Sequence, residues 1–214
     1  MDLREELAVG AHSMKSVLYL LTVLALLGAF DTLYYHEWRA RLPALGRSAR
    51  SELRLHAFRD FVYTILFVGL PWLVWQGRFV LLLVALFLVE VVRTLCDFVV
   101  EDWIRKPLGG VYPGERIVHA VMGIVYGAML AFVVPTMQIW WSRPTKLTLS
   151  PPVVAEPLRW FLVVMAVGVL LLSGVRDLCA AAGLRGSTRP WARQHSDQDG
   201  SLPVTRGRAK LNRG

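Results

Sequence analysis

Five long apolar runs constrain this chain more than any other feature of its sequence. They cover residues 16–35, 57–75, 79–100, 117–140 and 158–175. Each run supplies the roughly 20 mostly apolar residues that a helix needs to cross the hydrocarbon core of a bilayer. Of the 214 residues, 55% are hydrophobic and only 19% are charged, which is unusual for a water-soluble domain. The sequence therefore predicts an all-α integral membrane bundle with five transmembrane helices.

The distribution of Lys and Arg predicts the orientation of this bundle. With five spans, the N-terminus and the connections after the second and fourth runs share one side, which carries 6 of the 24 basic residues. The other side, which includes the C-terminal tail, carries 17, and Arg93 lies inside the third run. Because basic residues are enriched in cytoplasmic loops, we expect the N-terminus outside and the C-terminus in the cytoplasm. The expected location is the cytoplasmic (inner) membrane of a prokaryote.

The chain divides into two parts of different composition. Residues 1–182 are expected to form the transmembrane domain, and residues 183–214, rich in Gly, Ser, Pro and charge, a disordered basic cytoplasmic tail. The net charge of +8 fits the attraction of cytoplasmic arginines to anionic lipids. No nucleic-acid recognition motif accompanies that charge. The expected partner is therefore the lipid bilayer and not a nucleic acid.

Acidic and histidine side chains gather at one depth of the predicted bundle. Ionisable groups inside spans are costly and by default mark functional sites. Because successive spans alternate in direction, the end of the first, the start of the second, the end of the third and the start of the fourth meet in the cytoplasmic half. The ionisable residues there are Asp31, His36, Glu37, Glu52, His56, Asp60, Glu90, Asp97, Glu101, Asp102, Glu115 and His119.

Two Glu-His pairs in this set have the same spacing. The segment ELRLH contains Glu52 and His56, and ERIVH contains Glu115 and His119. Residues four apart lie on one face of a helix, so each pair presents a carboxylate and an imidazole side by side. These two donor types together suit iron, manganese or zinc. The repeated pair predicts a metal site.

At this point the sequence resembles the di-iron carboxylate proteins, whose four-helix bundles combine single glutamates with Glu-x-x-His motifs. The resemblance covers about residues 31–126 and concerns the type of site, since the pairs here are spaced by four instead of three. It implies two iron ions and an oxidoreductase acting on a lipid-soluble substrate such as a quinone, a fatty acyl chain or an isoprenoid. The metal ligands that it implies are His36, Glu37, Glu52, His56, Glu90, Asp97, Glu101, Glu115 and His119.

Further residues are assigned supporting roles by the same resemblance. Asp31 is an alternative to Glu37 beside His36, and the residues expected to orient the ligands are Asp31, Asp60, Arg93 and Asp102. The candidates for catalytic proton or electron donors are Tyr34, Tyr63 and Tyr126.

Other interpretations of these residues stay open. The acids and arginines can form a charged internal network in a non-enzymatic scaffold, or in a protein that binds lipid headgroups or a partner, with Glu90 and Arg93 as a structural ion pair. Two of the histidines can hold a b-type haem, or the polar cluster can carry protons in a transporter. The tyrosines and the eight tryptophans are also typical of the aromatic belts at membrane surfaces.

Overall fold

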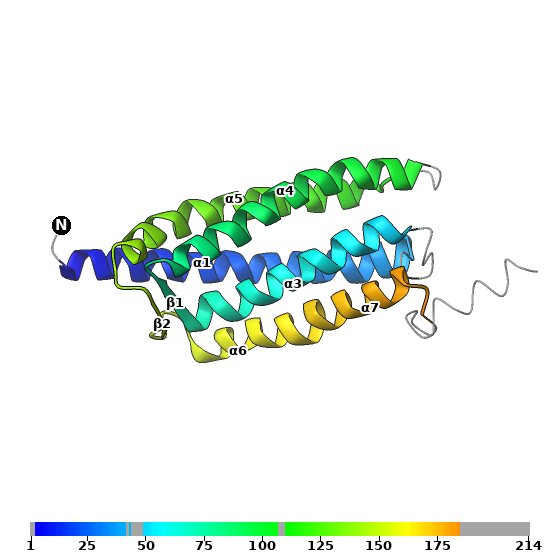
Figure 1. Ribbon diagram of the computed structural model, residues 1–214. Coiled ribbons are helices and arrows are strands. Elements are labelled where there is room, and N and C mark those ends of the chain that lie inside the picture. Colours follow the sequence, from blue (N-terminus) through cyan, green and yellow to red (C-terminus); the bar gives the residue numbers. More distant parts are fainter. Residues whose placement is uncertain (1–2, 42, 44–48, 107–109, 185–214) are drawn as a thin grey trace, which may run out of the picture.

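Long helical segments that alternate in direction make up the fold (Figure 1). The computed structural model describes residues 3–41, 43, 49–106 and 110–184, without the side chains of 3–9, 101, 102, 104 and 105. The predicted tail beyond residue 184 lies outside the described residues. The helical segments are α1 (Leu3–Phe30) with its π-helical continuation η1 (Asp31–Arg39), α3 (Arg50–Trp72), α4 (Phe79–Arg105), α5 (Pro113–Trp141), and the joined α6 (Glu156–Met165), η4 (Ala166–Leu171) and α7 (Leu172–Ala181).

Within the described residues, four helical stretches are long and apolar enough to cross a membrane. They are Gly10–Arg39, Phe79–Val100, Pro113–Trp141 and Glu156–Ala181. The prediction of a helical protein with apolar helices of membrane length is confirmed at this level. The stretch that does not qualify is α3, which carries His56, Arg59 and Asp60.

The end of the bundle opposite to the described C-terminal residues contains a small sheet. Strand β1 (Leu73–Gln76) pairs antiparallel with β2 (Lys146–Leu149), so that Leu73 lies opposite Leu149. The prediction that helix continues through residue 75 is wrong, because backbone groups after Trp72 bond to β2 instead of continuing the helix. Gly77, with a φ of 58°, then turns the chain into α4.

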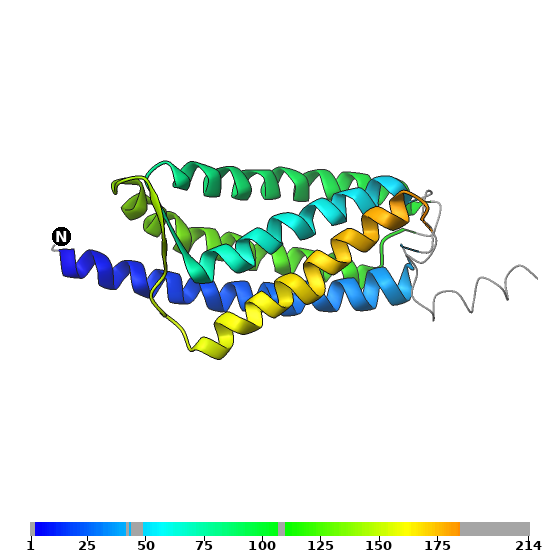
Figure 2. The ribbon, with the colours of Figure 1, turned by 60° about the horizontal axis from the view of Figure 1, so that its bottom comes forward.

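The helices pack in two groups that place the polar residues between them. α1 packs along α5, while α3 packs along α4 and along the last segment from α6 to α7, as the turned view in Figure 2 shows. The apolar core includes fully buried side chains from α1, α3, α4, α5 and α6, among them Leu18, Leu66, Phe67, Leu83, Met129 and Leu162. The bundle therefore has its apolar core along its length and most of its buried ionisable groups toward one end, with buried Arg159 at the other end as an exception.

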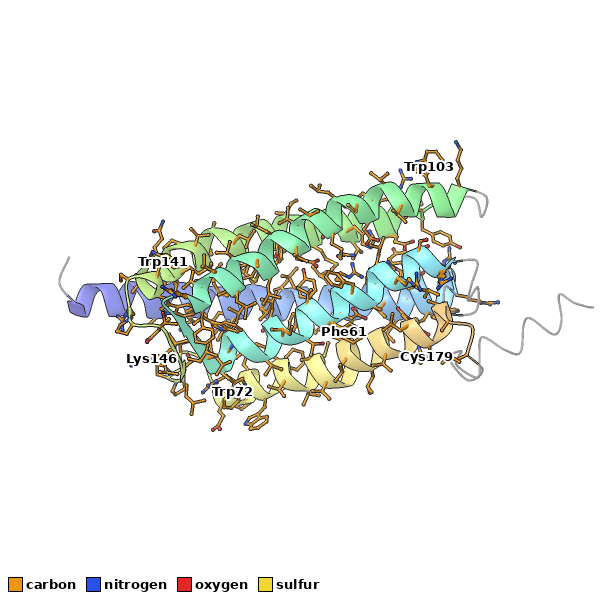
Figure 3. All side chains as sticks on the ribbon, viewed as in Figure 1. Phe61, Trp72, Trp103, Trp141, Lys146 and Cys179 are labelled. Atoms are coloured by element: carbon orange, nitrogen blue, oxygen red, sulfur yellow. The ribbon has the colours of Figure 1, made fainter. Side chains whose placement is uncertain are left out.

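The outer surface of the bundle is apolar. The more than half-exposed side chains on α1, α4, α5 and α6 include Leu26, Leu88, Leu95, Ile124 and Val164. Exposed Trp103 lies at one end of the bundle, and Trp72 and Trp141 lie at the other (Figure 3). Large exposed apolar surfaces on proteins mark contact with lipid or partners, and tryptophans at both ends are typical of membrane interfaces. This surface is consistent with a lipid bilayer environment.

Candidate metal centre

Four buried ionisable side chains meet where η1 lies against the start of α5. One donor atom from each of Asp31, His36, Glu115 and His119 lies within 4.8 Å of the other three. The Nε2 atom of His119 is 3.0 Å from Asp31 Oδ2. The Nε2 atom of His36 is 3.4 Å from the same oxygen and 3.2 Å from Glu115 Oε1. These four residues are called the ligand cluster below.

The π-helical geometry of η1 brings Asp31 and His36 to the same side. In an α-helix of 3.6 residues per turn, side chains five residues apart point about 140° away from each other. A π-helix closes its hydrogen bonds between residues i and i+5, and such segments are frequent at functional sites. Asp31 and His36 therefore project together toward α5. Helical spacings of three and four do not group these two residues, which is why the sequence predicts mainly a supporting role for Asp31.

The N-terminal turns of α5 supply the other half of the cluster. α5 begins at Pro113, a residue tolerated in the first turn because the N–H that it lacks has no helical partner there. Glu115 follows in that first turn and His119 one turn later on the same face. The structure therefore brings the Glu115 and His119 pair to a common point, as the spacing in the sequence predicts.

The second Glu-His pair lies beside the ligand cluster. The ring of His56 stacks on that of His36, with centroids 4.3 Å apart and planes inclined by 15°. His56 Nε2 is 3.8 Å from Asp97 Oδ2, and Glu52, one turn earlier on α3, is fully buried. Neither residue belongs to the four that share the close donor group. Their assignment as metal ligands stays a prediction.

Three of the other predicted ligands are close to arginine. Arg93 Nε is 3.2 Å from Glu90 Oε2, and Arg93 Nη1 is 3.1 Å from Asp97 Oδ2. Glu37 forms an ion pair with Arg176 of α7. The Glu90–Arg93 pair, considered as a structural alternative in the sequence analysis, is thus present. Because a guanidinium already balances part of the charge of these carboxylates, they are weaker candidates for metal ligation than the cluster.

An arginine from α3 completes the surroundings of the ligand cluster. Arg59 is buried, and its Nη2 atom is 4.0 Å from Asp31 Oδ2. Arg59 lies well inside α3, about two and a half turns after its start at Arg50. Asp60, the next residue, is also buried. The side chains of Glu101 and Asp102 lie outside the described residues, so their predicted roles are not tested.

The three candidate tyrosines occupy different surroundings. Tyr63 and Tyr126 are buried with ring centroids 6.3 Å apart, and the Tyr126 hydroxyl donates to the carbonyl of Phe87 over 3.4 Å. Tyr34 instead stacks on Phe30 at 5.3 Å, within a half-exposed group of aromatic residues. The first two line a cavity of about 330 Å³ between α3, α4 and α5, which also reaches His119. Tyr63 and Tyr126 are therefore the better placed of the three candidates.

The ligand cluster suits a bound cation. The carboxylates of Asp31 and Glu115 have no exposed surface, and buried charges are stable only when paired or bound to metal. Within the described part of the chain, the buried atom Asp31 Oδ1 makes no hydrogen bond. Two imidazoles and two carboxylates form a donor set that zinc, iron and manganese accept. The residues present therefore fit a transition-metal ion.

Comparison with protein families, curated proteins and solved structures found no match for this chain.

Proposed function

We propose that this protein is a membrane-embedded metalloprotein that holds a transition-metal ion in the ligand cluster, with iron as the first candidate. It would oxidise a lipid-soluble substrate with dioxygen as the electron acceptor. The main support is the close approach of four buried donor atoms, two from imidazoles and two from carboxylates, within 4.8 Å. A bound iron would supply the redox chemistry that the side chains lack. Asp31, His36, Glu115 and His119 would hold it, and their burial excludes bulk water from it.

We favour one ion over the two that the resemblance to di-iron proteins implies. The cluster offers four donors, enough to hold one iron ion while leaving coordination positions open for a reactant. A second ion on the side of Glu52 and His56 would draw on Glu90 or Asp97, which are ion-paired with Arg93. A metal bound there would displace the Arg93 guanidinium and break its ion pairs with Glu90 and Asp97. The two-ion arrangement therefore has less support.

We also propose that α3 crosses the membrane, which gives five spans. Its 23 residues reach about 35 Å, more than the roughly 30 Å of the hydrocarbon core. It runs antiparallel to α1 and α4, so a chain that crosses in both of them has to return through α3 (Figure 1). Its polar side chains His56, Arg59 and Asp60 are buried in the bundle. With the N-terminus outside, the ligand cluster would lie in the cytoplasmic half of the inner membrane.

The test of the metal centre is elemental analysis of the full chain purified in detergent. We expect about one transition-metal ion per chain, because the cluster forms one four-donor site. His36→Ala and His119→Ala should each lose most of that metal. His12→Ala is the matched control, because His12 is an exposed histidine elsewhere on α1, and it should keep the metal. Wild-type protein without metal, or full occupancy in both cluster variants, would refute the proposal.

A second candidate function is a scaffold with a buried charged network. It is favoured by the ion pairs of Arg93 and Arg176 with buried carboxylates, and such networks in some proteins specify how elements assemble. This candidate predicts metal-free protein. A b-type haem held by His36 and His56 has less support, because their rings stack face to face and cannot bind opposite faces of a haem in that arrangement. Purified protein with a Soret band would reverse that judgement.

A further inference from the structure

We propose that the cavity between α3, α4 and α5 is a binding site for a single-chain lipid with a neutral, oxygen-bearing head, such as a long-chain alcohol, and that this lipid enters sideways from the bilayer. The inference rests on the proposed function in one respect: the bound lipid would be the substrate of the metal centre. The binding site itself depends on the cavity alone.

The position of the mouth indicates where the ligand comes from. Of the residues that line the cavity, the exposed ones are Leu95 and Phe98 of α4 and Gly123 and Gly127 of α5. All four are uncharged and lie on two of the helices that can cross a membrane. A mouth with this lining opens toward hydrocarbon, where water and soluble metabolites are scarce. The ligand therefore has to be dissolved in the membrane.

The inner wall of the cavity indicates what kind of head the ligand carries. The charged lining residues are all buried: Arg59, Glu90, Arg93 and Asp97. Two guanidiniums and two carboxylates balance in formal charge, and the ion pairs of Arg93 already use part of that charge. A charged head would upset this balance at a cost that is high inside a bundle. A neutral hydroxyl or carbonyl can instead exchange hydrogen bonds with these groups.

His119 connects the cavity with the ligand cluster. It lines the cavity, and its Nε2 atom is 3.0 Å from Asp31 Oδ2 within the cluster. A lipid whose head reaches the inner wall would therefore lie next to a residue that holds the proposed metal. The volume of about 330 Å³ is at the small end of the range for ligand sites, about 300–1,000 Å³. It suits the head and the first part of one chain, with the rest of the chain in the bilayer.

Two glycines at the mouth allow the cavity to be closed by substitution. A Cβ atom added at Gly123 or Gly127 would meet no described atom within 4 Å, so a larger side chain there enters open space. Gly168 of η4 has the same open surroundings but does not line the cavity. Gly127→Leu and Gly123→Leu therefore narrow the mouth, and Gly168→Leu is the matched control for adding the same side chain to a spanning helix.

The test is photolabelling of the full chain in lipid nanodiscs with a hexadecanol that carries a diazirine on its chain. We expect labelling of α4 and α5 that unlabelled hexadecan-1-ol competes away and that hexadecanoate competes away at least about tenfold less well, because a charged head is costly to bury. Gly127→Leu and Gly123→Leu should lose roughly tenfold or more of this competable labelling, since each excluded methylene weakens binding severalfold. Gly168→Leu should keep it. Metal content and thermal unfolding are measured on every variant.

These measurements separate the lipid site from the metal centre. Competable labelling in protein that proves metal-free supports the lipid site and removes the metal centre. Metal-loaded wild type without competable labelling supports the metal centre and overturns the proposed lipid site. It is also overturned if hexadecanoate competes as well as the alcohol, or if a folded glycine variant labels like wild type. A variant that fails to fold leaves the decision to the other glycine and to the competition in wild-type protein.

Discussion

The ion pair between Glu37 and Arg176 joins η1 to α7, and its removal should lower stability by an amount that depends on which partner is changed. Glu37 is buried, and the Arg176 side chain is 19% exposed. Breaking a fully buried pair costs about 3–5 kcal/mol, whereas an exposed pair is worth about 0–1 kcal/mol. Because Arg176 is partly exposed, we expect Arg176→Met to cost about 2–3 kcal/mol, between these limits.

Changing the other partner, Glu37, should lower the free energy of unfolding by less. Arg176 Nη2 is also 3.5 Å from Asp177 Oδ1, so Arg176→Met deprives two buried carboxylates of a cation. Glu37→Gln removes one of these charges and leaves Arg176 with Asp177, so its cost should be about 1 kcal/mol. The double variant should be more stable than the sum of the single effects implies, with a coupling of about 1 kcal/mol, because Glu37→Gln breaks no ion pair with Arg176 once Arg176 has been replaced.

The measurement is reversible unfolding of the purified chain in mixed micelles, analysed as a double-mutant cycle. Glu156→Gln is the control, because Glu156 is an exposed carboxylate at the start of α6, and it should change the free energy of unfolding by no more than about 0.5 kcal/mol. The reasoning fails if Arg176→Met behaves like this control, if Glu37→Gln is the costlier change, or if the two effects are additive.

Two further substitutions test the packing of the last helix and the extent of the metal centre. Gly174→Ala should destabilise the bundle by about 1–3 kcal/mol, because a Cβ there would lie 3.1 Å from Asp60 Cβ and 3.2 Å from the Ala57 carbonyl oxygen. The control in the same unfolding assay is Gly168→Ala, where the added Cβ enters open space. Equal effects of the two substitutions would contradict the close approach of α7 to α3. His56→Phe should keep the metal content of wild type, because Phe preserves the stacking on His36 and His56 lies outside the ligand cluster. Loss of metal in that variant, measured by elemental analysis, would make His56 a ligand and restore the two-ion arrangement.

Much of the helical framework could be predicted from the local sequence pattern, and the errors in the predicted helix bounds have a common cause. The apolar runs locate α1, α4, α5 and the last helical segment, because hydropathy reports how much of a helix can lie in lipid. The same signal places the start of the first helix near residue 16, whereas α1 begins at Leu3, since a helix can extend beyond the part that lipid can cover. It also carries the second helix past Trp72, where pairing with a distant strand takes over.

The candidate site was likewise predictable in part from the sequence. The spacing of Glu115 and His119 fixes that they share a helix face, and the spacing of Glu90, Arg93 and Asp97 fixes a second local group. Neither spacing shows that the first group meets Asp31 and His36 while the second pairs internally. The π-helical turn of η1 is the reason that Asp31 joins the cluster, and i+3 and i+4 rules do not anticipate it.

The sequence by itself determined that this chain forms apolar helices of membrane length and that most of the acids and histidines within them lie toward one end. Both are set by which residues follow one another along the chain, because hydropathy and helical periodicity are local properties. Only the tertiary structure decided which carboxylates face an imidazole and which face a guanidinium. That choice depends on the rotation and depth of each helix against its neighbours, which are fixed when the bundle packs.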